Sequence, residues 1–194
     1  MRIFIALDID AAIRERLQLF MDGVRGFAPE ARWVCPESLH VTLKFIGNKS
    51  SGEADAISQS LARIAAAAIE ISFRGYGFFP TAKSPRVFWI GVEAGPPLAA
   101  LANTVDMTTA GLGVPKEEHP FSPHLTLARR GGSGAPRWRK GDAPNLSFQR
   151  LQDKLAAMSA PEFGTMTARE FFLYESQLGR GGSRYTKIAR FGLA

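Results

Sequence analysis

The stretch His40-Val41-Thr42-Leu43 recurs eighty-four positions later as His124-Leu125-Thr126-Leu127. Each copy lies in a run that alternates polar and apolar residues, which predicts a β-strand with one buried face. Because side chains of a strand alternate between its faces, each histidine shares a face with the threonine two places after it. On the first strand, the opposite, buried face is expected to hold Val41, Leu43 and Phe45. Two such strands can line one cleft from opposite sides, the arrangement that a two-sided proton transfer requires.

Chance is a poor explanation of the repeated pair. The chain has three histidines, and two of them are followed two places later by threonine, although threonine occupies only nine of the 194 positions. Random placement gives this result in roughly one sequence in a hundred or fewer, as for any short motif. The structural alternative is a pair of half-buried core histidines that neighbouring groups satisfy. The third histidine, His119, lies in the polar segment Glu117-Glu118-His119-Pro120 and is expected to face solvent.

Length and composition are those of a folded protein. With 194 residues and 45% hydrophobic side chains, the chain suffices for one domain or two closely joined lobes. Its formal charge of +6 and its pI near 9.8 favour a polyanionic partner such as RNA. The single cysteine, Cys35, cannot form an internal disulfide, which fits the reducing cytoplasm. No apolar run is long enough for a membrane span or a signal peptide.

Hydrophobic periodicity predicts a mixture of strands and helices. Ser50 and Glu53 have the spacing of a capping box at the start of the second helix, and Asp8 or Asp10 is expected to cap the first. The proline-rich segment 80–85 predicts a wide hairpin loop. We expect helices at 11–25, 51–68, 97–111 and around 148–158, and strands at 2–8, 32–34, 40–47, 70–79, 86–93, from 124, and at 168–175 and 184–191.

Other patterns carry weaker signals. The glycine-rich segments 129–132 and 179–182 lack the Gly-Lys-Ser/Thr ending of a P-loop and are interpreted as flexible links. The run Arg137-Trp138-Arg139-Lys140 has the cations and the aromatic ring to hold phosphates and stack a base, but a solvated charged loop is the favoured interpretation. No ligand spacing indicates a metal site, and Cys35 is interpreted as a buried or incidental thiol. We therefore expect neither a metal nor a cofactor.

The two histidine strands and their surroundings resemble the 2H phosphoesterase superfamily, and within it the bacterial and archaeal RNA 2′,3′-cyclic phosphodiesterases, also called 2′-5′ RNA ligases. The resemblance covers nearly the whole chain, and its specificity comes from the order and spacing of its parts. Besides the two His-x-Thr-x motifs, these parts are the opening residues 2–7, Trp33-Val34, Phe45-Ile46-Gly47, Phe121-Ser122-Pro123, Ala128-Arg129, residues 173–178, Tyr185 and Phe191.

The resemblance implies an α+β fold in which residues 1–194 form a single two-lobed domain, with two antiparallel sheets and flanking helices around a central cleft. It also implies an enzyme that hydrolyses the 2′,3′-cyclic phosphate of an RNA end to a 2′-phosphate without a metal ion, and that joins RNA ends by 2′-5′ ligation in reverse. On the matching positions, His40 is the proton donor and His124 the proton acceptor. Thr42, Thr126 and Arg129 are the residues implied to hold the phosphate.

The sequence leaves several alternatives open. Strict alternation places Arg129, five residues after His124, on the face opposite the histidine, which makes Arg130 the better placed cation unless the strand ends or bends there. Residue type alone leaves the roles of the two histidines exchangeable. The competing functions are a phosphodiesterase for another 2′-5′-linked or small cyclic nucleotide and a non-catalytic module that binds RNA ends. We expect a cytoplasmic monomer whose partners are RNA or oligonucleotide ends, with no membrane association.

Overall fold

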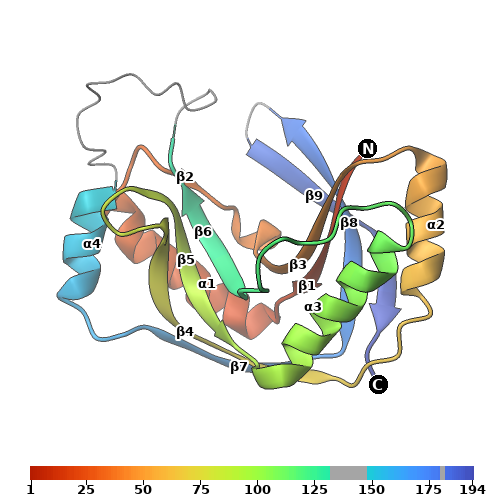
Figure 1. Ribbon diagram of the computed structural model, residues 1–194. Helices are drawn as coiled ribbons and strands as arrows, with labels where there is room; N and C mark the ends of the chain where they lie inside the picture. Colours follow the sequence, from red (N-terminus) through yellow and green to blue (C-terminus); the bar gives the residue numbers. More distant parts are fainter. Residues whose placement is uncertain (132–147, 180–181) are drawn as a thin grey trace.

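The computed structural model describes residues 1–131, 148–179 and 182–194, which form two antiparallel sheets (Figure 1). One sheet has four strands in the order β3-β1-β8-β9, and the other has five in the order β2-β6-β5-β4-β7. The expected α+β class with two antiparallel sheets is confirmed. The strands are β1 (Arg2–Asp8), β2 (Arg32–Trp33), β3 (His40–Asn48), β4 (Ile69–Pro80), β5 (Pro85–Glu93), β6 (His124–Arg129), β7 (Glu162–Ala168), β8 (Glu170–Gly179) and β9 (Gly182–Gly192).

The helices connect the two sheets crosswise. Helix α1 follows β1 of the four-stranded sheet but contacts β7 of the other, whereas α3 follows β5 of the five-stranded sheet and contacts β3 (Figure 1). No helix in the described segments is both long and apolar enough to cross a bilayer. The helices are α1 (Ala11–Val24), α2 (Ser51–Leu61), α3 (Gly95–Ala110) and α4 (Gln149–Ala156), with two short 3₁₀ turns, η1 (Arg25–Phe27) and η2 (Pro36–Ser38).

One cluster of buried apolar side chains spans both sheets. It includes Leu7 and Val41 from the four-stranded sheet and Ile90 and Leu125 from the five-stranded one. Because protein interiors are close-packed, this shared core fixes the position of one sheet relative to the other. The two histidine strands, β3 and β6, belong to different sheets, and Cα atoms of the two strands approach within 8 Å.

The helix caps were predicted with mixed success. The capping box of α2 is confirmed, since Ser50 Oγ accepts from the Glu53 amide and the Glu53 carboxylate accepts from the Ser50 amide. The expectation that Asp8 or Asp10 caps α1 was wrong: Asp10 occupies the cap position but its side chain makes no cap hydrogen bond. The Asp8 carboxylate instead accepts from the Ile9 amide and takes part in ion pairs near His40.

The boundaries of helix α2 and of the β4–β5 hairpin differ from the prediction, because segments distant in the sequence or in opposite strands pair through their backbones. Helix α2 ends at Leu61, because the chain beyond it pairs with the C-terminus through the Ala68 amide and the Ala194 carbonyl. The expected wide hairpin loop is narrower, since Pro80 and Pro85 already lie opposite each other in the sheet.

Strand β7 was not predicted, and α4 ends before Met158. The run Arg137-Trp138-Arg139-Lys140 and the residues 180–181 of the second glycine loop lie outside the described residues.

Candidate active site

Each histidine begins its strand with its ring anchored to the chain just before it. His40 Nδ1 lies 2.7 Å from the Ser38 carbonyl oxygen, and His124 Nδ1 lies 2.9 Å from the Ser122 carbonyl oxygen. A carbonyl oxygen can only accept, so in both rings Nδ1 carries a hydrogen and Nε2 remains for another partner. The two sheets therefore present the same imidazole arrangement from an equivalent Ser-x-His-x-Thr segment.

Both histidine strands contain a bulge immediately after the threonine. In β3, Thr42 lies opposite Ala6 and Lys44 opposite Ile5, so Leu43 is an extra residue. A bulge of this kind shifts the alternation of side chains by one position. The residue four places after His40, Lys44, is consequently buried, and the residue five places after it, Phe45, returns to the histidine face. The prediction that Phe45 lies on the buried face was wrong, and its side chain is 57% exposed.

Strand β6 contains the same kind of bulge. Thr126 lies opposite Trp89 and Ala128 opposite Phe88, which leaves Leu127 as the extra residue. Ala128 is buried, and Arg129 is exposed and lines the same cleft as His40. Strict alternation favoured Arg130 as the cation on the histidine face. The bulge shifts the alternation by one position and places Arg129 there instead.

The remaining predicted residues lie beside the cleft or away from it. Arg130 is exposed, donates its backbone N–H to the Arg86 carbonyl at 2.8 Å and does not line the cleft. Thr42 and Thr126 are half-buried beside their histidines. His119 is exposed, and Cys35, expected to be a buried or incidental thiol, is exposed at the cleft.

A cleft of about 720 Å³ opens beside His40, and we call it the arginine cleft. Among the described residues, three arginines and no aspartate or glutamate line it, and Phe45 and Tyr185 add aromatic surface. Its lining residues are Arg2, Ile3, Phe4, Arg32, Trp33, Val34, Cys35, Ser38, His40, Phe45, Gly47, Arg129, Ser176, Leu178, Gly179, Ser183 and Tyr185. Guanidinium groups recognise phosphate oxygens in a bidentate manner, so this lining suits a phosphate-bearing ligand.

His40 is enclosed by aromatic rings. Its ring centroid lies 4.9 Å from that of Phe4 and 5.2 Å from that of Tyr185, whose plane is perpendicular to the imidazole. Burial lowers the pKa of His40 below its usual 6.5, and the charges of Arg129 and His124 act in the same direction. The Ser38 carbonyl and Asp8 oppose this shift and raise the pKa. In the free protein, His40 therefore loses its proton more readily than an exposed histidine.

His124 lies within electrostatic reach of His40 but in a different aromatic environment. Its ring centroid is 5.1 Å from that of Phe79, with the planes at 78°, and 6.3 Å from that of Trp89. It does not line the arginine cleft. The fold thus brings the two predicted histidines into one electrostatic environment from two sheets.

A network of charged side chains is centred on Asp8, which lies opposite His40 on the neighbouring strand β1. Asp8 forms an ion pair with Arg14 at 2.6 Å and another with Lys187. Burial raises the pKa of Asp8, but hydrogen bonds and the two cations outweigh it and hold the pKa below its usual range. Arg14 also donates to the Pro36 carbonyl in η2, the turn that carries the Ser38 carbonyl. This network was not foreseen, because its members are far apart in the sequence.

Lys44 is a second feature that sequence reasoning missed. Its side chain is 1% exposed, forms an ion pair with Asp106 on α3 and donates to the Pro115 carbonyl at 2.6 Å. Glu117 lies 3.6 Å from the same ammonium. Lys44 thereby connects the bulge after His40 to the segment that leads into β6. Nothing in the sequence indicates this burial, because lysine side chains are rarely buried without a partner and the partner lies on a distant helix.

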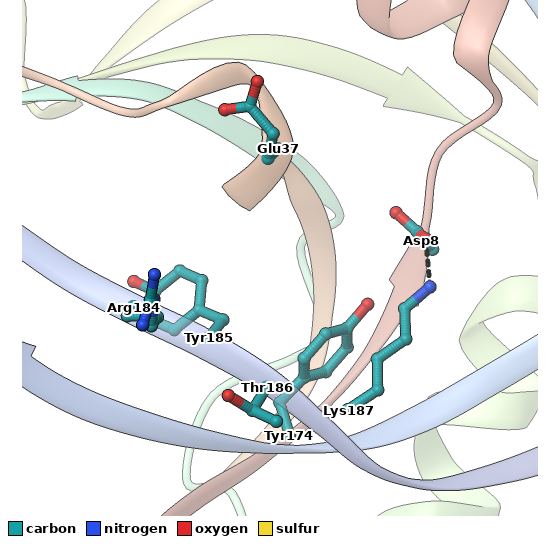
Figure 2. Close-up of a pocket in the computed structure, with 7 residues that line it drawn as sticks. All are labelled: Asp8, Glu37, Tyr174, Arg184, Tyr185, Thr186 and Lys187. Atoms are coloured by element: carbon teal, nitrogen blue, oxygen red, sulfur yellow. Dashed lines mark hydrogen bonds and ion pairs between the residues drawn. The ribbon is translucent and has the colours of Figure 1, made fainter.

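A second hollow of about 430 Å³ adjoins the arginine cleft at Tyr185, which lines both (Figure 2). We call it the tyrosine pocket; its lining residues are Asp8, Glu37, Tyr174, Arg184, Tyr185, Thr186 and Lys187. In the described part of the chain, no three histidine, cysteine, aspartate or glutamate side chains are grouped as metal ligands.

Comparisons with known proteins agree with the sequence resemblance. Residues 13–171 match the model of the 2′-5′ RNA ligase superfamily. The chain is 33% identical over 191 residues to an RNA 2′,3′-cyclic phosphodiesterase of Archaeoglobus fulgidus, covering 98% of this chain and 99% of that protein. It is 31% identical over 197 residues to the Escherichia coli protein of the same name, covering 99% and 96%. The crystal structure of E. coli LigT complexed with 3′-AMP superposes with a TM-score of 0.76 at 30% identity, covering 99% of this chain and 97% of that one.

Proposed function

Because this chain belongs to the 2′-5′ RNA ligase superfamily, we propose that it hydrolyses the 2′,3′-cyclic phosphate of RNA ends to a 2′-phosphate, as a cytoplasmic monomer and without a metal ion. The observation that carries this proposal is the pair of histidines on β3 and β6, each with Nδ1 on a serine carbonyl and with Nε2 unengaged by any described residue. The names of the curated relatives support the substrate, and the predicted enzyme class, a phosphodiesterase, agrees with them.

The reaction needs a base on one side of phosphorus and an acid on the other. A water oxygen forms a bond to phosphorus while the bond from phosphorus to the 3′ oxygen breaks. His124 accepts the proton of the attacking water, and His40 donates a proton to the departing 3′ oxygen, which leaves a 3′-hydroxyl and a 2′-phosphate. Each of these transfers contributes about 10²- to 10⁴-fold to the rate. Both histidines then exchange protons with solvent before the next turnover.

The groups around the histidines suit a phosphate that gains negative charge. Arg129, from the second histidine strand, lines the cleft together with Arg2 and Arg32, and Thr42 and Thr126 place hydroxyls two residues after each histidine. Donors that are fixed before the substrate arrives stabilise developing charge more than mobile water does. The bound phosphate anion also raises the pKa of His40, so the donor becomes protonated in the complex although burial lowers its pKa in the free protein.

The same site supports 2′-5′ joining when a nucleophile other than water is present. A 5′-hydroxyl of a second RNA then attacks the cyclic phosphate, the 3′ oxygen leaves, and the product is a 2′-5′ phosphodiester. The proton acceptor and donor keep their roles, since the attacking group again loses a proton and the leaving group gains one. A high concentration of RNA ends favours this outcome over hydrolysis by mass action.

The test is turnover of a short RNA that ends in a 2′,3′-cyclic phosphate, measured in EDTA for the wild type, His40→Ala and His124→Ala. We expect the wild type to release a 2′-phosphate, identified by ³¹P NMR, and both variants to lose at least a hundredfold in kcat. His119→Ala is the matched control, because that histidine is exposed and outside the cleft.

Two results would contradict the proposal. Turnover by folded His40→Ala and His124→Ala variants at near wild-type rates would exclude paired histidine catalysis. Tight RNA binding without turnover by the wild type would favour a module that only binds RNA ends, and turnover of other 2′-5′-linked or cyclic nucleotides alone would favour a different phosphodiesterase.

A further inference from the structure

The arginine cleft and the tyrosine pocket meet beside His40 but differ in charge. Arg2, Arg32 and Arg129 line the cleft, and none of its lining residues is acidic. The pocket contains two carboxylates, Asp8 and Glu37, together with two cations. Opposite charges favour binding, so the cleft attracts a phosphodiester strand, whereas the two carboxylates and two cations of the pocket offset one another and give no such attraction.

The polar groups of the tyrosine pocket suit an uncharged ligand. Lys187 is already engaged with Asp8, so its charge is largely offset. Glu37 is exposed and has no ion-pair partner among the residues that the structure describes, which leaves its carboxylate free to accept hydrogen bonds. The Tyr174 hydroxyl points into the space that Glu37, Asp8 and Lys187 surround (Figure 2). These groups can satisfy the donors and acceptors of a neutral base or sugar.

Tyr174 is held ready as a hydrogen-bond donor. Its ring stacks on Phe4 with centroids 5.0 Å apart and planes only 7° from parallel, which fixes its orientation. Burial raises the pKa of the Tyr174 hydroxyl above its usual 10, and Asp8 acts in the same direction, so the group stays protonated throughout the neutral range. Within the described segments, no protein group accepts a hydrogen bond from it.

The size and position of the pocket fit a nucleoside next to the proposed acid. Its volume of about 430 Å³ lies inside the range of about 300–1,000 Å³ that is usual for small-molecule sites. Tyr185, which lines it, packs edge-on against His40. The acid must reach the 3′ oxygen of the terminal ribose, so the sugar and its base lie on the His40 side of the phosphate.

We propose that the tyrosine pocket binds the base and ribose of the nucleotide that carries the cyclic phosphate, and that the arginine cleft binds the phosphodiester strand that precedes this nucleotide. This assignment rests on the function proposed above and adds the orientation of the RNA to it. Glu37 and Tyr174 recognise the base of the terminal nucleotide, whereas Arg32 binds the phosphodiester strand.

Three substrates separate these contributions: uridine 2′,3′-cyclic phosphate, the 2,3-cyclic phosphate of 1-O-methylribose, which lacks the base, and a short RNA that ends in the same cyclic uridine. For Tyr174→Phe and Glu37→Gln, we expect kcat/KM for the two uridine substrates to fall about three- to tenfold through KM, the range for one lost hydrogen bond. The loss for the base-free sugar is expected to be below twofold.

Arg32→Gln is the complementary variant. This variant is expected to lower kcat/KM for the RNA substrate about three- to tenfold through KM. The salt dependence of that KM should also decrease, because one phosphate contact is lost. Uridine 2′,3′-cyclic phosphate and the base-free sugar phosphate lack the strand, and their kcat/KM should change less than twofold. Arg190→Gln is the matched control, since that arginine lies on the same strand as Tyr185, is 72% exposed and pairs with Glu170.

The orientation is overturned if Tyr174→Phe and Glu37→Gln affect all three substrates equally, or if they affect only the RNA. Failure of the wild type to hydrolyse any of the three would contradict the proposed function instead. In that case, calorimetric titration with uridine 2′-phosphate still tests whether the tyrosine pocket binds the nucleoside. Equal affinities of the wild type and Tyr174→Phe would overturn this assignment, and weaker binding by the variant would support it.

Discussion

Asp8 lies directly opposite His40 on the neighbouring antiparallel strands β1 and β3, and its charge raises the pKa of that histidine. Asp8 is itself held by Arg14 and Lys187, so the carboxylate is fixed in place. Arg129 reaches His40 from the other sheet and lowers its pKa. Burial is the largest influence on the pKa of the proposed acid, and Arg129 and Asp8, which belong to different sheets, shift that pKa in opposite directions.

Replacing Asp8 with asparagine removes the negative charge but keeps the side chain's shape. The pKa of His40 is expected to fall further below 6.5, because the remaining charges near it are positive. Nitrogen-detected NMR of the histidine side chains across pH 4 to 9 measures this value directly. Glu170→Gln, which removes a carboxylate paired with Arg190 at 3.2 Å, is the control and should leave it unchanged. A rise in the His40 pKa after Asp8→Asn would contradict the assigned role.

Arg129→Gln should have the opposite effect on the same titration. Removing this positive charge is expected to raise the pKa of His40, since Arg129 lowers it in the wild type. The adjacent Arg130→Gln is a closely matched control, because that side chain does not line the cleft. If both substitutions raised the pKa equally, general charge rather than the position created by the bulge would be responsible.

The predicted elements that proved correct are those encoded locally. Ser50 and Glu53 lie three residues apart, so their capping box is visible in the sequence. The histidine strands carry their own alternating pattern, and the positions of His40 and His124 follow from it. The family resemblance is likewise confirmed by the full-length relatives.

The features that were missed depend on partners distant in the sequence. The bulges at Leu43 and Leu127 arise from pairing with β1 and β5, and alternation within one strand cannot reveal them. They decide which side chains reach the cleft, which is why Phe45 was assigned to the wrong face. The burial of Lys44 likewise depends on Asp106, sixty-two residues away.

The depressed pKa of His40 also predicts how stability changes with pH. The unfolded chain, whose histidine has the usual pKa of 6.5, binds a proton more readily than the folded chain. The free energy of unfolding should therefore be highest above pH 6.5 and decrease as the pH falls through the folded pKa. Urea denaturation from pH 5 to 8 is expected to show this decrease in the wild type and a smaller one in His40→Gln. Identical pH dependence in both proteins would show that His40 does not contribute.

The buried ion pair between Lys44 on β3 and Asp106 on α3 is expected to contribute to stability. Lys44→Met removes the cation and leaves the Asp106 carboxylate, which is 16% exposed, without its partner. We expect a loss of about 3 kcal/mol in the free energy of unfolding, measured by chemical denaturation, because breaking one side of a buried pair strands a charge. In Lys44→Met with Asp106→Leu, most of this loss should be recovered.

The control for this experiment is Lys49→Met. Lys49 pairs with Glu53 at 3.0 Å, but that carboxylate is 53% exposed, so solvent screens the pair and the loss of stability should be much smaller than for Lys44→Met. If the double variant recovers stability but not turnover of the cyclic phosphate, Lys44 positions the two histidine strands. Equal recovery of stability and turnover would limit its role to stability.

A substitution at Gly77 tests how Trp89 packs between this glycine and His124. The glycine lies on β4 opposite Trp89, and a methyl group added there would collide with the indole ring. Gly77→Ala is therefore expected to destabilise the protein by about 1–3 kcal/mol, the usual cost of overpacking. It should also shift the NMR signals of the His124 ring, because the Trp89 and His124 centroids are 6.3 Å apart.

Gly23→Ala provides a control of opposite sign. Gly23 lies in α1 and has no atom within 4 Å of an added Cβ. Alanine there should stabilise the protein by about 0.5–1 kcal/mol, because glycine loses more conformational freedom in a helix. Thermal and urea denaturation of the two variants, followed by spectra of the His124 ring, give the comparison. A neutral Gly77→Ala with an unmoved His124 signal would mean that Trp89 can shift without disturbing the histidine, and that the indole does not fix the ring of the proposed base.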